Sequence, residues 1–375
     1  MALFLVAASA TVSAADTYGD AVSAVHRDDY DLAARLFRLL AEQGHAGAQS
    51  FLAVLYANGQ GVLQDYEIAG QWYREAAQQG DAAAQFQLGL LYASGQGVAQ
   101  NYEEAGRWYR RAADQRMAVA QFQLGEIHAN GQGVPQSYEE AGQWYRLAAE
   151  QGHAAAQFQL GALYANGQGV PQSYEEAVQW YQRATDQGHA RAQSHLGLLH
   201  AHGQGLQKDY RAAIRWYRRA AEQGDALAQF QLGVLYANGQ GVPQSYEKAA
   251  LWYRRAADQG DAGAQFNLAV RYDNGQGVPQ SYSEAGRWYR RAAQQGHARA
   301  QSNLGVLYAG GQGVPKDVIR AYMWLTVAVT GSRGDDVKTA IMNQTTVAAG
   351  MTAAQVEQGQ EMARRCRESQ FVQCE

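Results

Sequence analysis

Histidines are the residues of this chain whose spacing comes nearest to that of a metal site. Four of the nine histidines fall in one short stretch, at His189, His195, His200 and His202. His195 and His202 lie close to two helical turns apart and share a helix face, whereas His195 and His200 diverge. A zinc site usually needs three or four converging ligands, with helical pairs four residues apart. No cysteine or acid joins these histidines at such a spacing, so we predict no metal site and no cofactor.

Motifs of nucleophilic or metal-assisted catalysis are missing from the sequence. It contains no G-x-S-x-G, no H-E-x-x-H and no cysteine with an evident partner base. Glycine pairs such as Gly95/Gly97 and Gly131/Gly133 look like phosphate loops, but a phosphate loop follows a strand and precedes Lys-Ser/Thr. Helical patterns precede these pairs, so we interpret them as turns. We therefore predict no catalytic residue and no enzymatic activity.

The charges are balanced, with 31 basic and 35 acidic residues and a net charge of −4. Nucleic-acid-binding proteins have an excess of clustered Lys and Arg, and this class is therefore excluded. Strings such as R-W-Y-R-R place Arg107, Arg110 and Arg111 together, with Glu103 one helical turn before Arg107. Such i, i+4 pairs stabilise an exposed helix surface. We interpret these strings as a solvated face rather than an anion-binding strip.

A repeat of 36 residues organises most of the chain. All copies open with an Ala-Gln pair, at Ala48, Ala84, Ala120, Ala156, Ala192, Ala228, Ala264 and Ala300. All eight tryptophans occupy a single phase of this unit, from Trp72 to Trp324. A fixed period between 20 and 50 residues is the signature of a solenoid, in which neighbouring repeats share one core.

Each copy contains two helical patterns, and the second copy shows the first of them clearly. Leu88 and Leu91 follow helical spacing and predict a helix over residues 82–94, with Asp81 as its N-cap. Gly95 can supply the left-handed conformation that ends this helix. Gly89, in mid-helix, recurs in most copies. A glycine there costs about 1 kcal/mol relative to alanine, and we therefore expect a neighbouring helix to approach closely at this position.

The second helical pattern begins just after the glycine turn. Ser137–Glu140, Ser173–Glu176 and Ser281–Glu284 have the spacing of a capping box. The tryptophan and the following tyrosine then lie on the apolar face, so we predict core packing for the tryptophans rather than a stacking ladder for sugars or bases. A Gln-Gly pair ends the helix in most copies. Arg116 replaces that glycine once, and we expect a less tightly made corner there.

The string L-G-x-L-Y-A-N-G-Q-G-V-P-Q-x-Y-E-E-A-x-x-W-Y-R-x-A-A-x-Q-G resembles the Sel-one-like repeat (SLR) family, a branch of the tetratricopeptide superfamily. The resemblance extends from about Tyr30 to Leu325. It implies an all-α fold, a right-handed α-solenoid superhelix of antiparallel helix pairs. It also implies a non-catalytic role in protein–protein contact, often in bacterial envelope or signalling assemblies. Some secreted relatives are associated with β-lactam binding, but they carry a cysteine pair in each repeat, which this chain lacks.

Four segments follow from this pattern. Residues 1–15 resemble a secretory signal that lacks its basic start, although an apolar first helix is the alternative. Residues 16–45 are expected to form an N-terminal capping helix pair, residues 46–333 the eight-repeat solenoid, and residues 334–375 C-terminal capping helices, over about 335–348 and 352–368. Cys366 and Cys374, the only cysteines, form a disulfide if the chain is exported and remain free thiols in the cytosol.

A partner is expected on the concave face, which the first helix of each pair lines in tetratricopeptide-type folds. We align each copy to the family pattern at its Leu-Gly pair. This alignment places on the concave face a series of phenylalanines, one aliphatic residue and several residues that depart from the repeat. These are Phe86, Phe122, Phe158, Phe230, Phe266, Leu90, Glu126, Arg191, His195 and Asp273. Such a surface suits a protein or peptide segment with apolar anchors. Alternatively, the phenylalanines pack between repeats and only border the groove.

The signal-like start and the family resemblance favour a periplasmic or secreted scaffold that binds a protein partner. A module that binds peptidoglycan or another glycan through exposed aromatics is the alternative. No segment has the roughly 18 unbroken apolar residues of a membrane span, so an integral membrane protein is not expected.

Overall fold

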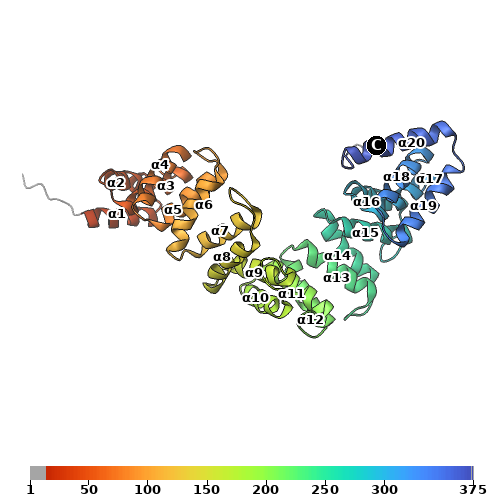
Figure 1. Cartoon of the computed structure of the whole chain (residues 1–375), viewed down its shortest axis with the longest axis horizontal. Coiled ribbons are helices and arrows are strands. Elements are labelled where there is room, and N and C mark those ends of the chain that lie inside the picture. The colour runs from red at the N-terminus through yellow and green to blue at the C-terminus, as the bar shows by residue number, and fades with distance from the viewer. Residues whose placement is uncertain (1–13, 373, 375) are drawn as a thin grey trace, which may run out of the picture. The chain divides into compact units, whose positions relative to one another are not determined.

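The computed structural model describes residues 14–372 and 374, and within these residues it contains twenty α-helices and no strand. The chain divides into two compact units, Met1–Ala184 (unit one) and Thr185–Glu375 (unit two). The signal predicted over residues 1–15 lies outside the described residues except for Ala14 and Ala15, which begin the first helix. The all-α fold with consecutive helix pairs is confirmed (Figure 1).

Odd-numbered and even-numbered helices alternate as the first and second members of each pair. The odd helices are α1 (Ala14–His26), α3 (Ala46–Asn58), α5 (Ala82–Ser94), α7 (Ala118–Asn130), α9 (Ala154–Asn166), α11 (Ala190–His202), α13 (Ala226–Asn238), α15 (Ala262–Asn274) and α17 (Ala298–Gly310). The even helices are α2 (Tyr30–Glu42), α4 (Tyr66–Gln78), α6 (Tyr102–Asp114), α8 (Tyr138–Glu150), α10 (Tyr174–Asp186), α12 (Tyr210–Glu222), α14 (Tyr246–Asp258), α16 (Tyr282–Gln294) and α18 (Val318–Gly331). The last two helices are α19 (Asp335–Ala348) and α20 (Ala353–Glu368).

Side-chain caps and left-handed glycines set the ends of these helices, as predicted. The Asp81 carboxylate accepts a hydrogen bond from the Ala84 N–H at 2.7 Å and starts α5. Gly95, at φ 75°, ends it. The second glycine of the turn has a different role, because a Cβ on Gly97 would lie 2.3 Å from the backbone of Tyr66. The G-x-G turns are therefore helix-capping turns that press against the preceding pair.

The capping boxes differ from the prediction in one respect. Ser137 and Ser281 do cap their helices, each accepting a hydrogen bond from the backbone N–H three residues on. Their partner glutamates turn to other groups, however, Glu140 to His128 at 2.9 Å and Glu284 to Arg287 at 2.6 Å. The Arg287 cation outcompetes the N-cap backbone for the Glu284 carboxylate. A reciprocal box is present at Thr352, at the start of α20.

The mid-helix glycines are sites of close helix approach, as expected. A Cβ added to Gly89 would lie 2.6 Å from the ring of Tyr109, a buried residue of the paired helix α6. Gly125, Gly161, Gly197 and Gly233 have the same relation to the tyrosines of their own pairs. The glycine of one helix and the tyrosine of the next are therefore the two sides of one contact.

Buried glutamines join successive repeats in a way that the sequence did not reveal. Gln85 donates to the Ala77 carbonyl at 3.0 Å, and its own carbonyl accepts from Gln115 at 2.9 Å. Equivalent Gln–Gln bonds join Gln79 to Gln49, Gln151 to Gln121, Gln223 to Gln193, Gln259 to Gln229 and Gln295 to Gln265. Because a buried amide must be satisfied, this ladder fixes how one repeat sits on the next.

The corner at Arg116 is built with strain. Arg116 adopts φ 66°, in the left-handed region that the glycines of other copies occupy. The following N-cap, Met117, makes no side-chain cap bond, whereas His153 and Asp225 do so in other copies. The hydrogen bond that closes the corner, from the Met117 N–H to the Ala112 carbonyl, is 3.3 Å long. The expectation of a looser corner is met.

Replacing Arg116 with glycine and Met117 with aspartate should stabilise unit one. Glycine avoids a left-handed cost of roughly 1 kcal/mol, and an aspartate cap adds about 1 kcal/mol. Urea denaturation followed by circular dichroism measures the gain. As a control, Arg111→Gly, within α6, should lower stability by about 1 kcal/mol. If the urea midpoint of the double variant equals that of the unchanged protein, the corner at Arg116 is not strained.

The C-terminal helices cover the end of the array. α18 packs against α17, α19 and α20, and Cys366 of α20 is joined to Cys374 by a disulfide. The loop that this bond closes presents Phe371, whose ring would lie 3.0 Å from a Cβ at Gly296. The bounds of α19 and α20 agree with the helices predicted over about 335–348 and 352–368.

Candidate functional site

The exposed side of the odd helices forms a regular surface, which we call the odd-helix face. It carries a row of amides, with Gln87, Gln123 and Gln159 in unit one and Gln231, Asn267 and Asn303 in unit two. One turn further along lies a row of mostly aliphatic residues, Val54, Leu90 and Ala162 in unit one and Leu198, Val234, Val270 and Val306 in unit two. All of these residues are at least partly exposed, Val306 to 41%.

The predicted phenylalanine series lies one residue away from the amide row, and it packs mainly inward. Phe86, Phe122, Phe158, Phe230 and Phe266 each contact the tyrosine of their own pair, with ring centroids 5.7–6.0 Å apart. Phe158 is only 4% exposed and is therefore a core residue rather than a partner contact. One residue turns a helix by about 100°, which moves the aromatic rings to the edge of the face.

Phe230 and Phe266 nevertheless line a pocket on the odd-helix face of unit two. The pocket has a volume of about 380 Å³, and Gly263, Asn267, His297 and Arg299 are among its other lining residues. Gly263 is close to Phe230, since a Cβ there would lie 3.3 Å from the ring. The absence of a side chain at Gly263 therefore leaves the phenylalanine accessible.

The His297 ring forms one wall of this pocket and has a structural role as well. It stacks on Phe266 with the centroids 4.6 Å apart and the planes 22° from parallel. Its Nδ1 accepts a hydrogen bond from the Ala300 N–H at 3.2 Å, which caps α17. Burial lowers the pKa of His297, so the neutral ring that the cap requires is favoured.

An ion pair closes the other side of the pocket. Arg299 Nε lies 2.8 Å from Asp336 Oδ2, which links α17 to α19. Both side chains are substantially exposed, at 61% and 40%. Together these groups give an apolar floor with an amide, an imidazole and one compensated ion pair at the rim. Such a pocket suits an uncharged apolar side chain carried on a peptide backbone.

Acidification should destabilise the cap at His297. The folded pKa of His297 lies below the unfolded value of about 6.5. The stability that the neutral cap supplies is therefore complete above about pH 6.5 and is lost as the pH falls through the lower folded value. We expect His297→Asp, which copies the cap at Asp261, to flatten the decline in unfolding free energy between pH 7.5 and 5. A parallel decline in both proteins would contradict this role.

The remaining predicted residues of unit one are partly engaged within the protein. Glu126 accepts hydrogen bonds from the Tyr145 hydroxyl at 2.5 Å and from Gln159 at 2.8 Å, and so ties α7 to α8 and α9. Leu90 lies on the face and is partly exposed. The main role of Glu126 is therefore to connect repeats, because its carboxylate already accepts two hydrogen bonds from within the protein.

In unit two, Asp273 accepts from the Tyr289 hydroxyl at 3.0 Å, and Asn303 donates to the same hydroxyl at 2.9 Å. Arg191 is exposed at the start of α11. The His195 Nδ1 lies 2.8 Å from the Arg191 carbonyl, and burial lowers its pKa. Asp273 therefore makes one local contact, and Arg191 and His195 share another, so the structure does not join the three residues in one site.

The histidine cluster of the sequence is dispersed. The His189 side chain caps α11 through a hydrogen bond from the Ala192 N–H at 3.2 Å, while His202 is exposed at the other end of the same helix. Among the described residues, no group of three or more His, Cys, Asp or Glu side chains is placed to hold a metal ion.

The tryptophans are packed to different depths, and arginines cover several of the rings. Trp324 is fully buried, and Trp108, Trp180 and Trp288 are 6–9% exposed. Arginines of the same helix lie over Trp108, Trp180, Trp216, Trp252 and Trp288, at 4.3–5.0 Å from the ring centroids. This cation–π stacking occupies ring faces that a sugar would need, so core packing is the main role of the series.

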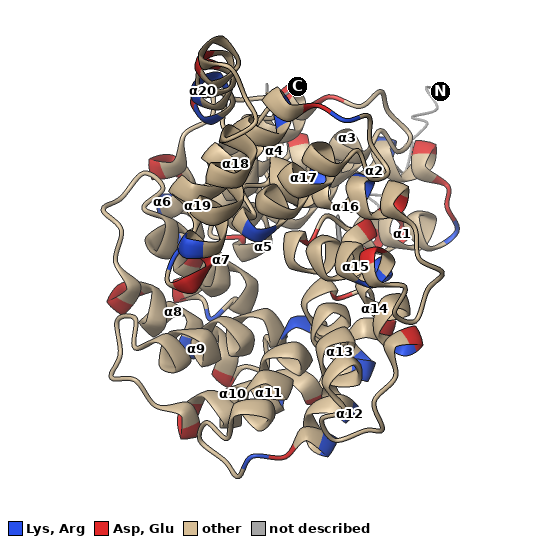
Figure 2. Cartoon of the chain, turned by 90° about the vertical axis from the view of Figure 1, so that its right-hand side faces the viewer, with Lys and Arg blue, Asp and Glu red and all other residues tan. Residues whose placement is uncertain are grey.

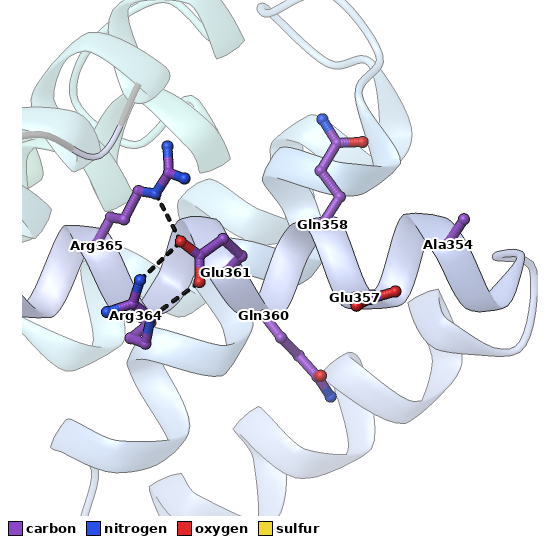
Figure 3. Close-up of a pocket in the computed structure, with 7 residues that line it drawn as sticks. All are labelled: Ala354, Glu357, Gln358, Gln360, Glu361, Arg364 and Arg365. Atoms are coloured by element: carbon purple, nitrogen blue, oxygen red, sulfur yellow. Dashed lines mark hydrogen bonds and ion pairs between the residues drawn. The ribbon is translucent and has the colours of Figure 1, made fainter.

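A hollow of about 670 Å³ along α20 is a weaker candidate site. Its seven lining residues all come from this one helix (Figure 3). Glu361 lies between Arg364 and Arg365 at 2.7–2.8 Å, and these bonds hold its pKa at about 2. Glu361 and the two arginines therefore neutralise one another, and the hollow is only the solvent-exposed side of α20.

The charges on α20 are of mixed sign, and no described helix could span a membrane. Basic and acidic residues are interspersed along α20 in Figure 2. In the part of the chain that the structure describes, no helix is long and apolar enough to cross a membrane.

Comparison with known proteins gives a family and two informative structures. The Sel1 repeat model matches nine consecutive segments, residues 15–45, 46–81, 82–116, 118–153, 154–189, 190–225, 226–261, 262–297 and 298–330. The helix pair predicted as an N-terminal cap over 16–45 is thus itself matched as a repeat. No curated protein matches the chain.

A protective antigen present in uropathogenic Escherichia coli strains, which displays an SLR fold, is similar in structure. It is 33% identical, the similarity covers 96% of this chain and 78% of that one, and the TM-score is 0.88. A Sel1 repeat protein from Oxalobacter formigenes is 36% identical over 64% of this chain and 96% of that one, with a TM-score of 0.58. The chain belongs to the Sel1 repeat family and is an α-solenoid of helix pairs.

Proposed function

We propose that this protein is a non-catalytic scaffold that holds an extended segment of a partner protein on its odd-helix face. The observation that carries the proposal is the pocket at Phe230, Phe266 and His297, which opens on the same face as the amide and aliphatic rows. The pocket would take an apolar side chain of the partner. Sel1 repeat proteins are generally protein-interaction scaffolds, which supports this reading.

The two rows suit a peptide backbone. An amide side chain both donates and accepts, as a peptide group does. Adjacent helices pack roughly 8–10 Å apart, and an extended chain advances about 3.3 Å per residue. Successive amides such as Gln231 and Asn267 would therefore meet the partner's backbone at about every third residue. The valines beside them would contact its apolar side chains.

We further propose that the partner lies in the bacterial cell envelope and that the chain is exported. The disulfide between Cys366 and Cys374 is of a kind that persists in oxidising compartments. The description of the Escherichia coli relative as a protective antigen also suits an exported protein. The intact mass of the protein from separated periplasmic and cytosolic fractions tests this. Loss of the first 14 or 15 residues is expected, and an uncleaved cytosolic chain would overturn the proposal.

Affinity capture from envelope extracts tests the scaffold function. Val306→Glu places a charge on the odd-helix face, where the side chain is 41% exposed. Leu251→Glu is the matched control, since Leu251 is 51% exposed on the even helix α14. We expect Val306→Glu to lower capture of the partner about tenfold, because burying an unpaired carboxylate in an interface is costly.

The control should capture as much partner as the unchanged protein. Circular dichroism and melting curves must match across the three proteins, so that loss of binding is not loss of fold. Equal capture by both variants would place the binding surface elsewhere. Retention of glycan in place of protein would favour a glycan-binding module.

A further inference from the structure

A ladder of arginine–tyrosine bonds runs along the array on a different side from the odd-helix face. In six copies an even-helix arginine donates to the hydroxyl of a tyrosine eighteen residues later, in the next odd helix. The pairs are Arg38–Tyr56, Arg74–Tyr92, Arg146–Tyr164, Arg218–Tyr236, Arg254–Tyr272 and Arg290–Tyr308. Each hydroxyl gives its arginine an acceptor and covers the space between two repeats.

One pair in unit one is broken by substitution of the tyrosine. His128 occupies the tyrosine position, and its Nδ1 turns away to Glu140 Oε2 at 2.9 Å. Arg110 therefore loses its acceptor. Its guanidinium lies over the Trp144 ring at 4.6 Å, and its nearest acid, Asp114, is 3.9 Å from Nε.

A pocket of about 280 Å³ opens at this place. Its floor is apolar and is made by Leu124, Ile127 and Val134, and Arg110 and His128 are among the polar residues at its rim. Leu124 and Ile127 are otherwise buried, at 4% and 3% exposure.

Gly106 completes the hollow, because a Cβ there would contact Ile127 at 3.7 Å. Gly70, Gly142 and Gly286 share this position with Gly106, whereas Val178 and Ile214 fill it in other copies. The histidine is what sets this copy apart from the other glycine copies. The glycine leaves the space open, and the phenol that would cover it is missing.

Of the two arginines that line the pocket, Arg110 has the longer ion pair. Arg107 is held by Glu103 at 2.6 Å and by Glu104 at 2.5 Å. Glu140 lies against His128. Arg110 lines the pocket, and its ion pair with Asp114 is long, at 3.9 Å. Its guanidinium can therefore still donate two parallel hydrogen bonds to a carboxylate.

We propose that this pocket binds a short aliphatic carboxylate, with the carboxylate on Arg110 and the hydrocarbon part over Leu124, Ile127 and Val134. The volume admits a group of about the size of one branched residue. Two sources have this chemistry, the C-terminal residue of a peptide and a free short-chain acid. The proposal does not depend on the scaffold function, since His128 lies about 140° around α7 from Gln123 of the odd-helix face.

Isothermal titration of the full chain tests the proposal with three probes. These are 3-methylbutanoate, the peptide acetyl-Gly-Leu with a free carboxylate, and the same peptide as its C-terminal amide. We expect both carboxylates to bind with one site per chain, and the amide to bind at least about tenfold more weakly because it forgoes the charge-assisted bond. Tighter binding of the peptide acid than of 3-methylbutanoate would assign a peptide C-terminus. The reverse order would assign a free acid.

The chain itself supplies variants that should fold. His128→Tyr restores the common pair, Gly106→Ile copies Ile214, and Arg110→Gln copies Gln182 at the equivalent position. His128→Tyr and Gly106→Ile should remove binding, and Arg110→Gln should weaken it about tenfold. Gly142→Ile fills the equivalent position one repeat on and should leave binding unchanged. Absence of binding by both carboxylates, or binding that survives His128→Tyr, would overturn the proposal.

Discussion

Replacing Trp324 with alanine is expected to lower the free energy of unfolding by about 3–5 kcal/mol. Trp324 is fully buried within the largest apolar cluster of unit two, which also contains Tyr308, Met323 and Cys366. Its helix, α18, contacts α17, α19 and α20. The cavity left by the indole would therefore loosen the end that covers the array, and repeats that lose a neighbour lose part of their own stability.

The matched control is Trp216→Ala, at the same phase of the repeat. Trp216 is only partly buried, and the guanidinium of Arg219 lies over its ring at 5.0 Å. A partly exposed indole loses less apolar contact, and we expect a cost of roughly 1–3 kcal/mol. Urea denaturation followed by far-ultraviolet circular dichroism measures both. Equal losses in the two variants would contradict the different depths at which the tryptophans are packed.

Replacing Gly125 with valine is expected to cost about 3 kcal/mol, at the upper end for an overpacked core. A Cβ at Gly125 would lie 2.4 Å from two ring carbons of Tyr145, which is 1% exposed. The ring cannot retreat without separating α7 from α8, and a branched side chain adds two further carbons to the clash.

Gly125→Ala should cost less than the valine variant, because Ala53 and Ala269 occupy the equivalent position in two copies. Gly106→Ala is a second control, since its Cβ would meet Ile127 at an ordinary contact distance of 3.7 Å. Denaturant midpoints of the three variants give the order. A valine variant as stable as the alanine variants would show that the Gly–Tyr contact does not set the helix spacing.

The helices were predictable because each local signal agrees with the fold. Asp81 and Gly95 mark the two ends of α5, and the structure begins and ends that helix beside them. Thr352 caps α20 as predicted. Near-identical copies also repeat each signal, so that a cap or turn recognised once applies along most of the chain. The family match over nine segments follows from the same regularity.

The candidate site was less predictable, for a physical reason. The odd helices are apolar or small on almost every side, so helical periodicity alone does not tell which side faces solvent. Phe86 and Phe158, which were expected on the face, pack against the tyrosines of their own pairs. Asn267 and Gln231 were missed as members of the exposed row. The repetition of Gln or Asn directly after the phenylalanine was the available signal.

The pocket at Phe230 and the glutamine ladder depend on contacts between repeats. His297 and Arg299 belong to the repeat after Phe266, and Asp336 belongs to the C-terminal helices. No spacing within one copy brings these residues together. Likewise, Gln85 looks like a surface residue until its partners Ala77 and Gln115 are placed around it.

Site-specific photo-crosslinking in intact cells tests the scaffold account most directly. A benzophenone side chain at Asn267, on the odd-helix face, is compared with one at Leu251, exposed on the even helix α14. The account predicts one dominant protein adduct from position 267, lost when Val306→Glu is added, and little adduct from position 251. Adducts of equal yield at both positions, or an adduct at 251 alone, would contradict binding on the odd-helix face.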